Sequence, residues 1–192
     1  MDPFSYLSVL ISIVLALGMT QVLTGVGEML QARAIRRIYW VHALWVFNLF
    51  LFLVVAWWIF YRWRNVTEWT YYLFLFVLIA PTLLYLASIV LFPPLGPRSE
   101  AAADYKTHYY ANRGSFFILF GLWVPVDVAD SLLKGTAHFR ELGTAYIISA
   151  IVLTIVFVLA ATTRNERVHG FLAVYFLVHT IALSLIFFRT LI

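Results

Sequence analysis

The stretch IYWVHALWVFNLFLFLVVAWWIFY, residues 38–61, contains no charged side chain in 24 positions. An α-helix rises about 1.5 Å per residue, so about 20 apolar residues cross a hydrocarbon core of roughly 30 Å. The stretch is apolar on every side instead of alternating with polar positions, which excludes the pattern of a membrane barrel strand. It therefore predicts a transmembrane α-helix.

Similar runs without charge lie on both sides of this stretch. They are residues 3–27, 69–97, 142–163 and 168–188. A sixth run, 114–133, is equally apolar but contains Asp127 and Asp130. The chain is 64% apolar and 11% charged, with a mean hydropathy of +0.92, which excludes an ordinary soluble domain. We predict an all-α polytopic membrane protein, in which residues 1–192 form one transmembrane domain built as a six-helix bundle.

The connection between the third and fourth spans is the only long one. It opens with Pro93, Pro94 and Pro97, which cannot continue a helix. Ser99 then offers an N-cap to a helix-prone stretch, Glu100 to Tyr110. We expect a short helix there, lying at the membrane interface and anchored by its tyrosines. The alternative is a solvated tether.

The basic residues predict the orientation of the spans and their partners. The first, third and fifth connections carry eight Lys and Arg residues, whereas the second, the fourth and the C-terminal tail carry five. The positive-inside rule then places both termini on the non-cytoplasmic side of the plasma (inner) membrane. These charges suit anionic lipid head groups, and no cluster resembles a nucleic-acid footprint. We therefore expect the lipid bilayer as a partner and no nucleic acid.

Several kinds of site are excluded by missing residues. The chain has no cysteine, which excludes disulfides, thiolate metal sites and iron–sulfur clusters. It contains neither HExxH nor GxSxG, so a non-enzymatic function is favoured. His42 and His169 lie near the cytoplasmic ends of two spans and could in principle bridge a haem or a metal ion. Histidines that face lipid head groups explain them better, so no cofactor is expected.

Small side chains recur at every third or fourth position of the first run and form a ridge. Its members are Ser5, Ser8, Ser12, Ala16, Thr20 and Thr24. In lipid, such a ridge lets helices approach closely, because packing and hydrogen bonds replace the hydrophobic effect. We expect the ridge to be a packing face, with a polar pore lining as the alternative. Helices with such small side chains leave a surface on which a second copy of the chain can pack, which favours a homo-oligomer.

Asp127 and Asp130 are the acidic groups that lie far from both ends of a span. A charge at that depth costs several kcal/mol unless it is paired, hydrated or neutralised. Lys134 follows Asp130 by four residues on the same helix face, so these two can form an ion pair. Asp127 has no basic residue within one turn. Pro125 leaves the carbonyl of Gly121 without its donor, which predicts a kink between these residues.

Two further polar residues lie at a depth similar to that of Asp127. They are Asn48 and His179, on spans that run in the same direction. Tyr175, one turn before His179, could orient the imidazole. A histidine beside an acid can exchange protons near neutral pH, so Asn48, Asp127 and His179, together with Asp130, form a candidate ion or proton pathway.

We therefore expect a small channel or transporter for protons, ions or a small solute. A non-catalytic structural or accessory subunit of a larger membrane complex would use the same residues as interhelical hydrogen-bond partners. A lipid or quinone site lined by the many Phe and Trp side chains is a third hypothesis. These hypotheses differ in what surrounds Asp127: water for a pathway, a dry paired environment for a scaffold, and an apolar cleft for a lipid site.

Overall fold

The computed structural model describes residues 3–34, 37–66, 68–93 and 104–187. Its α-helices are α1 (Pro3–Gln31), α2 (Trp40–Phe60), α3 (Tyr71–Val77), α4 (Ile79–Val90), α5 (Tyr105–Gly121), α6 (Trp123–Leu133), α7 (Thr136–Thr162) and α8 (Glu166–Phe187), with short 3₁₀ helices at Ala32–Ala34 and Tyr61–Asn65. The described residues contain no strand and form six segments long and apolar enough to cross a membrane. The prediction of an all-α six-span bundle is confirmed.

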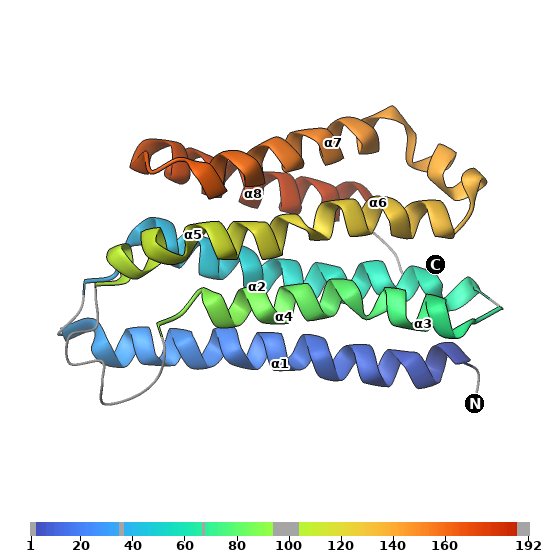
Figure 1. Ribbon diagram of the computed structural model, residues 1–192, viewed down its shortest axis with the longest axis horizontal. Coiled ribbons are helices and arrows are strands. Elements are labelled where there is room, and N and C mark those ends of the chain that lie inside the picture. The colour runs from blue at the N-terminus through green and yellow to red at the C-terminus, as the bar shows by residue number, and fades with distance from the viewer. Residues whose placement is uncertain (1–2, 35–36, 67, 94–103, 188–192) are drawn as a thin grey trace.

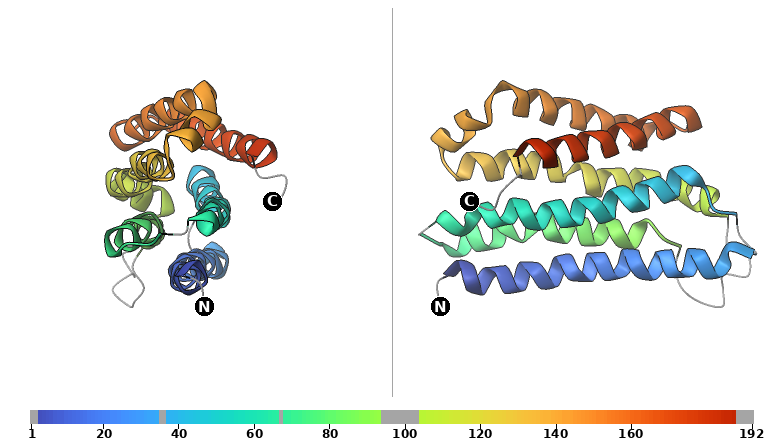
Figure 2. Two further views of the ribbon diagram at one scale, coloured as in Figure 1. Left: turned by 90° about the vertical axis from the view of Figure 1, so that its right-hand side faces the viewer. Right: turned by 180° about the vertical axis from the view of Figure 1, so that it is seen from behind.

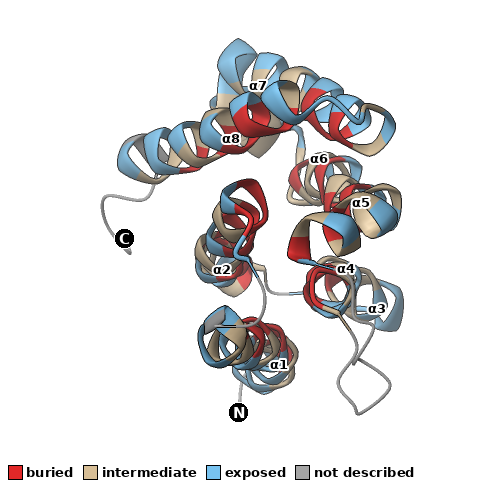
Figure 3. Cartoon of the chain, turned by 90° about the vertical axis from the view of Figure 1, so that its left-hand side faces the viewer, coloured by how far each residue is buried: buried red, intermediate tan, exposed pale blue. Residues whose placement is uncertain are grey.

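The helices lie along one long axis, and the six spans alternate in direction, with α3 and α4 forming one span and α5 and α6 another (Figure 1). α1 begins at the end of the bundle where the α6–α7 connection lies, and α8 points toward that end (Figure 1). Seen along the axis, α7 and α8 form one outer layer, α1 lies on the opposite side, and the other helices lie between them (Figure 3). α7 and α8 diverge from their connection toward the α6–α7 end (Figure 2).

Large apolar side chains cover the outside of the bundle. Among them are Val9 and Ile13 on α1, Ile151 on α7, and Phe171 and Val178 on α8, each more than half exposed. An exposed apolar surface of this extent is unfavourable in water and favourable in hydrocarbon. The chain is therefore an integral, multi-pass membrane protein whose outer surface contacts the lipid bilayer.

The face of α1 that packs inside the bundle is not the predicted ridge of small residues. Its buried residues are Leu7, Ile11, Leu15, Gly18, Val22, Gly25 and Met29. Gly25 allows the closest approach, because a Cβ there would lie 2.4 Å from the ring of Phe92. On the ridge, Ala16, Thr20 and Thr24 are exposed, and Ser12 accepts a hydrogen bond from Trp57. Contrary to expectation, the part of the ridge formed by Ala16, Thr20 and Thr24 is not a packing face within the described chain.

Two spans are each divided into two helices by proline. α3 and α4 meet at Leu78, and α5 and α6 meet at Leu122. Pro81 and Pro125 follow these positions by three residues, and each lacks the N–H that would complete the hydrogen bonds of the preceding turn. The second interruption lies where the kink between Gly121 and Pro125 is expected. The interruption at Leu78 was not predicted from the sequence.

The separate interfacial helix expected from Glu100 to Tyr110 is not observed. Residues 100–103 lie outside the described residues, and Tyr105 to Tyr110 form the first turns of the spanning helix α5. Tyr105 and Tyr109 are buried in the bundle instead of anchoring a helix at the interface. Their rings pack on His42, which attaches the start of α5 to the start of α2.

An aromatic core fills the bundle on the side of the α7–α8 connection. It is centred on Trp45 of α2, whose ring centroid lies 4.8–6.5 Å from the rings of Phe116, Phe117, Phe120, Phe157 and Phe176. These rings come from α5, α7 and α8 and are almost completely buried. Aromatic pairs at such distances stabilise a core beyond simple area burial.

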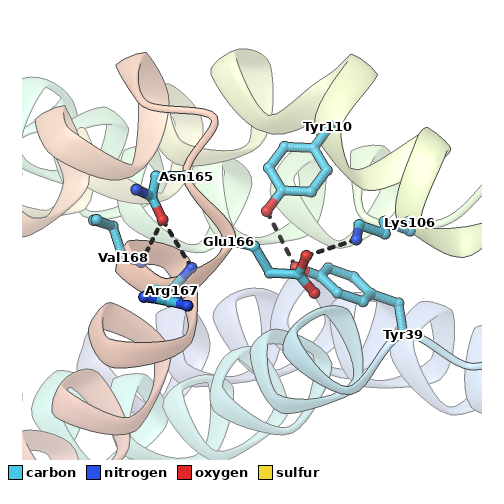
Figure 4. A network of polar contacts seen from close by, with 7 residues as sticks. All are labelled: Tyr39, Lys106, Tyr110, Asn165, Glu166, Arg167 and Val168. Atoms are coloured by element: carbon cyan, nitrogen blue, oxygen red, sulfur yellow. Dashed lines mark hydrogen bonds and ion pairs between the residues drawn. The ribbon is translucent and has the colours of Figure 1, made fainter.

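A polar network closes the same end of the bundle (Figure 4). Lys106 at the start of α5 forms an ion pair of 2.6 Å with Glu166 at the start of α8. The hydroxyls of Tyr39 and Tyr110 are 3.1 Å apart, and Asn165 caps α8 by accepting hydrogen bonds from backbone N–H groups of its first turn. Burial, followed by the hydrogen bond with Tyr110, raises the pKa of Tyr39 above its ordinary value.

Candidate functional site

A cavity of about 330 Å³ lies among α2, α6, α7 and α8, in the half of the bundle toward the α6–α7 connection. Its apolar walls include Phe52, Trp123, Leu153 and Phe176 at the middle of the bundle. Its polar residues lie closer to the connection and include Arg62, Asp127, Asp130, Lys134, His138 and Tyr146. The cavity therefore has an apolar inner part and a charged outer part.

Asp130 forms the ion pair with Lys134 that its spacing predicted. Lys134 Nζ lies 2.5 Å from Oδ2, and Trp63 Nε1 donates to Oδ1 at 2.6 Å. Nζ also lies 4.8 Å from the centre of the Trp63 ring. Burial lowers the pKa of Lys134, and the neighbouring Asp130 opposes that shift. Because both carboxylate oxygens already have protein partners, Asp130 is a structural group at this site.

Asp127 is held by a different helix. Tyr146 of α7 donates its hydroxyl hydrogen to Asp127 Oδ2 at 2.7 Å. The Ser131 hydroxyl, 3.1 Å from the Tyr146 oxygen, must then be the donor of that second bond. The Arg62 guanidinium interacts electrostatically with the carboxylates of Asp127 and Asp130. Asp127 therefore faces the cavity with one oxygen fixed by α7 and a cation nearby.

His179 lies on the α8 wall of the same cavity. Its Nε2 is 3.0 Å from Ser149 Oγ, and its ring stacks on Tyr175 at 5.8 Å with an interplanar angle of 25°. The stacking is the contact expected of Tyr175. In the described part of the chain Asp127 and His179 do not hydrogen-bond each other, and each is bound to a separate residue of α7, Asp127 to Tyr146 and His179 to Ser149. The cavity brings them together without pairing them.

Asn48 does not join Asp127 and His179 in one layer, contrary to expectation. It is buried, its side-chain amide donates to the carbonyl of Ala173 at 2.9 Å, and it does not line the cavity. A similar depth along the axis does not bring side chains together when they project in different directions around their helices. Asn48 instead ties α2 to α8 beside the aromatic core.

The two histidines considered for a haem or a metal ion have protein partners. His42 Nε2 lies 2.8 Å from the carbonyl of Leu91. His169 uses both nitrogens, Nδ1 with the Tyr109 hydroxyl at 2.7 Å and Nε2 with the Thr163 carbonyl at 3.1 Å. The Tyr109 ring contacts both imidazoles, and the described residues contain no group of three or more potential metal ligands. Because both nitrogens of His169 are bonded, His42 and His169 do not each offer a free nitrogen to a common haem or metal ion.

Sequence reasoning missed several polar residues of the site, including His138 and Ser149 as well as Arg62, Tyr146 and Ser131. Arg62 was assigned to a connection, Tyr146 was counted within an apolar run, and Ser131 was not considered. The available signal was that Ser131 follows Asp127 by four residues on the same helix face. No comparable signal connects Tyr146 or Arg62 to Asp127, because the contact depends on how α2 and α7 pack against α6.

The cavity ends against the aromatic core. Its innermost residues on α2 and α8 are Phe52 and Phe176, and Phe176 also contacts Trp45 in that core. Chemically, the site offers a carboxylate, a cation and hydroxyls at one end and aromatic faces at the other. In comparisons with known proteins, the chain matches no family model, no curated protein and no solved structure.

Proposed function

We propose that this protein binds an amphipathic small molecule of the bilayer in the cavity among α2, α6, α7 and α8. One observation carries the proposal: a single cavity presents Asp127 and Arg62 at its outer end and aromatic side chains at its inner end. Ligand sites in proteins are mostly apolar with a few polar groups that fix orientation. The polar group of the ligand would lie near Asp127, and its apolar part against Phe52 and Trp123.

The volume limits the size of the ligand. About 330 Å³ is near the lower end of the range for small-molecule sites. The cavity therefore suits one head group and the start of a tail, and is too small for a phospholipid with two chains. The rest of a tail would lie against exposed apolar side chains such as Ile147 and Ile181.

The positive-inside count supports placing both termini on the non-cytoplasmic side of the plasma (inner) membrane. The cavity would then lie in the non-cytoplasmic half of the bundle. Tags at Met1 and at Ile192 should both react with an impermeant reagent in intact cells. Labelling of either tag only after the membrane is opened would reject this orientation.

Binding can be tested by filling the cavity. Ala150 lines it, whereas Ala16 is exposed on α1, so Ala150→Phe and Ala16→Phe form a matched pair. We expect a neutral photoactivatable alkyl probe to label α6 and α7 in the wild type and in Ala16→Phe, and to lose this labelling in Ala150→Phe. Equal labelling in all three folded proteins would contradict the proposal.

A proton or ion pathway is the second candidate, because Asp127 and His179 line the same cavity. The pathway would require water to pass the aromatic core around Trp45. Liposomes containing a pH-sensitive dye would test it, with Asp127→Asn expected to abolish or reset the pH dependence of the flux. Asp130→Asn should mainly weaken folding and leave flux detectable. No flux above empty liposomes from folded protein would reject this candidate.

We further propose that copies of the chain associate, through the ridge left exposed on α1. Ala16, Thr20 and Thr24 present a thin surface on which a second copy or another subunit could pack closely. Thr20→Leu should then reduce crosslinking between copies in membranes, whereas Leu23→Ile, at an exposed position of α1, should not. A crosslinking yield unchanged by Thr20→Leu would reject the ridge as the interface.

A further inference from the structure

The charges that line the cavity are balanced. Two basic groups, Arg62 and Lys134, accompany two acidic groups, Asp127 and Asp130, when histidine is counted as neutral. Lys134 and Asp130 neutralise each other in an ion pair. The remaining two groups, Arg62 and Asp127, carry opposite charges and interact electrostatically. A ligand with a net charge would therefore be buried without a counterion, which is unfavourable. The charge balance favours a neutral ligand.

Hydrogen-bonding groups lie on two different walls of the cavity. Asp127 and Tyr146 belong to α6 and α7, whereas His179 belongs to α8. The carboxylate of Asp127 accepts hydrogen bonds. The imidazole of His179 uses Nε2 with Ser149, and no hydrogen bond within the described part of the chain reaches its Nδ1. A ligand that has oxygens at opposite ends could be held from both walls at once.

The inner part of the cavity is aromatic. The ring of Phe52 lies 4.5 Å from Trp123 and 5.7 Å from Phe176, and all three side chains line the cavity. Aromatic side chains pack favourably against other flat rings, in offset or edge-on geometry. A planar head group fits such walls better than a branched or strongly hydrated one.

Resting on the proposed binding function, we infer that the ligand is a neutral planar ring of the quinone or quinol class, with an apolar tail. A ring hydroxyl of the quinol would donate to Asp127, and the opposite oxygen would bond to the imidazole of His179. The ring would pack among Phe52, Trp123 and Phe176. The tail would leave the cavity along the apolar outer surface of α7 and α8.

The test is calorimetric titration of the purified full-length protein in detergent with a decyl-substituted benzoquinone in its reduced form. Decanoate and decylphosphocholine carry the same chain on an anionic and a zwitterionic head group, and they serve as comparison probes. We expect saturable binding of the quinol alone. Replacing the charged acceptor with a neutral amide, in Asp127→Asn, or removing the imidazole, in His179→Phe, should weaken it about tenfold. The matched controls Asp104→Asn and His108→Gln lie at the other end of the bundle and should bind as the wild type does.

The outcomes separate the two proposals. Binding of decanoate or decylphosphocholine without the quinol would overturn the quinol inference and leave the binding function standing. Failure of all three probes to bind folded protein would overturn both. Quinol binding that is unchanged in folded Asp127→Asn and His179→Phe would place the ligand elsewhere. Should these variants not fold, Tyr146→Phe and Ser149→Ala test the same two walls by releasing Asp127 and His179 from α7.

Discussion

The bond between Asp127 and Tyr146 gives the sharpest test of how the site is assembled. Two double-mutant cycles share the variant Asp127→Ala. The first combines it with Tyr146→Phe, which removes only a hydroxyl, and the second combines it with His179→Ala. The structure places a direct hydrogen bond of 2.7 Å in the first pair and separate α7 partners in the second. The two cycles should therefore give different coupling energies.

The expected magnitude follows from the type of bond and its surroundings. A hydrogen bond to a charged group contributes about 1.5–3 kcal/mol in soluble proteins. Interhelical hydrogen bonds in a membrane protein average about 0.6 kcal/mol, with a maximum near 1.7, because the unfolded chain in the membrane also finds partners. We expect about 0.6–1.7 kcal/mol for Asp127 with Tyr146. For Asp127 with His179 we expect additivity within about 0.5 kcal/mol.

The assay is reversible unfolding in mixed micelles of mild detergent and dodecyl sulfate, followed by tryptophan fluorescence. Ser131→Ala is the control, because it removes the second partner of the Tyr146 hydroxyl and leaves the bond to Asp127. The cycle of Asp127 with Tyr146 should keep its coupling in the Ser131→Ala background. A larger coupling for Asp127 with His179 than for Asp127 with Tyr146 would refute the assignment of partners.

Three further predictions concern the packing and the pH dependence of the fold. Gly143 has φ 69° and ψ −177°, a backbone conformation that residues with a Cβ rarely adopt. Gly143→Ala should therefore lower the free energy of unfolding by about 1–3 kcal/mol in the same assay. The control Gly27→Ala, at a helical site with open space, should raise it slightly. Gly121→Ala should cost about 1–3 kcal/mol, because its Cβ would lie 2.8 Å from that of Phe157; a cost near zero would show that α5 and α7 separate freely. The folded-state pKa of Tyr39 is raised above its ordinary 10.0, so the contribution of its protonated hydroxyl to stability is complete below pH 10 and is lost as the pH rises further. Tyr39→Phe should therefore flatten the fall in unfolding free energy that is measured from pH 9 to 11. An unchanged slope would count against the burial of Tyr39.

Sequence reasoning located the spans because their signal is local. A run such as residues 38–61 must satisfy its backbone polar groups internally in lipid, and only a helix does so within one segment. The interruption near Pro125 and the pair of Asp130 with Lys134 were also predictable, since a missing N–H and a spacing of four residues act within one helix. The prediction of an interfacial helix was wrong for the described residues 105–110, because these polar residues at the start of α5 resembled a separate element.

The packing face of α1 was less predictable. Small side chains identify a surface that permits close approach, but Leu15 and Val22 on a neighbouring face provide larger area for contact. Two glycines on that buried face, Gly18 and Gly25, supply the small positions that close packing requires. Sequence periodicity therefore allowed two candidate faces, and the neighbouring helices selected one of them.

The sequence by itself determined the environment of the protein, the number of its spans and the acidic residues that require an explanation. Only the tertiary structure decided that Asp127 bonds to Tyr146, that Asn48 bonds to Ala173, and that His179 shares a cavity with Asp127 without pairing to it. The physical reason is the range of each interaction. Span formation depends on transfer of a local segment into lipid, whereas these contacts depend on the order and rotation of helices that are far apart along the chain.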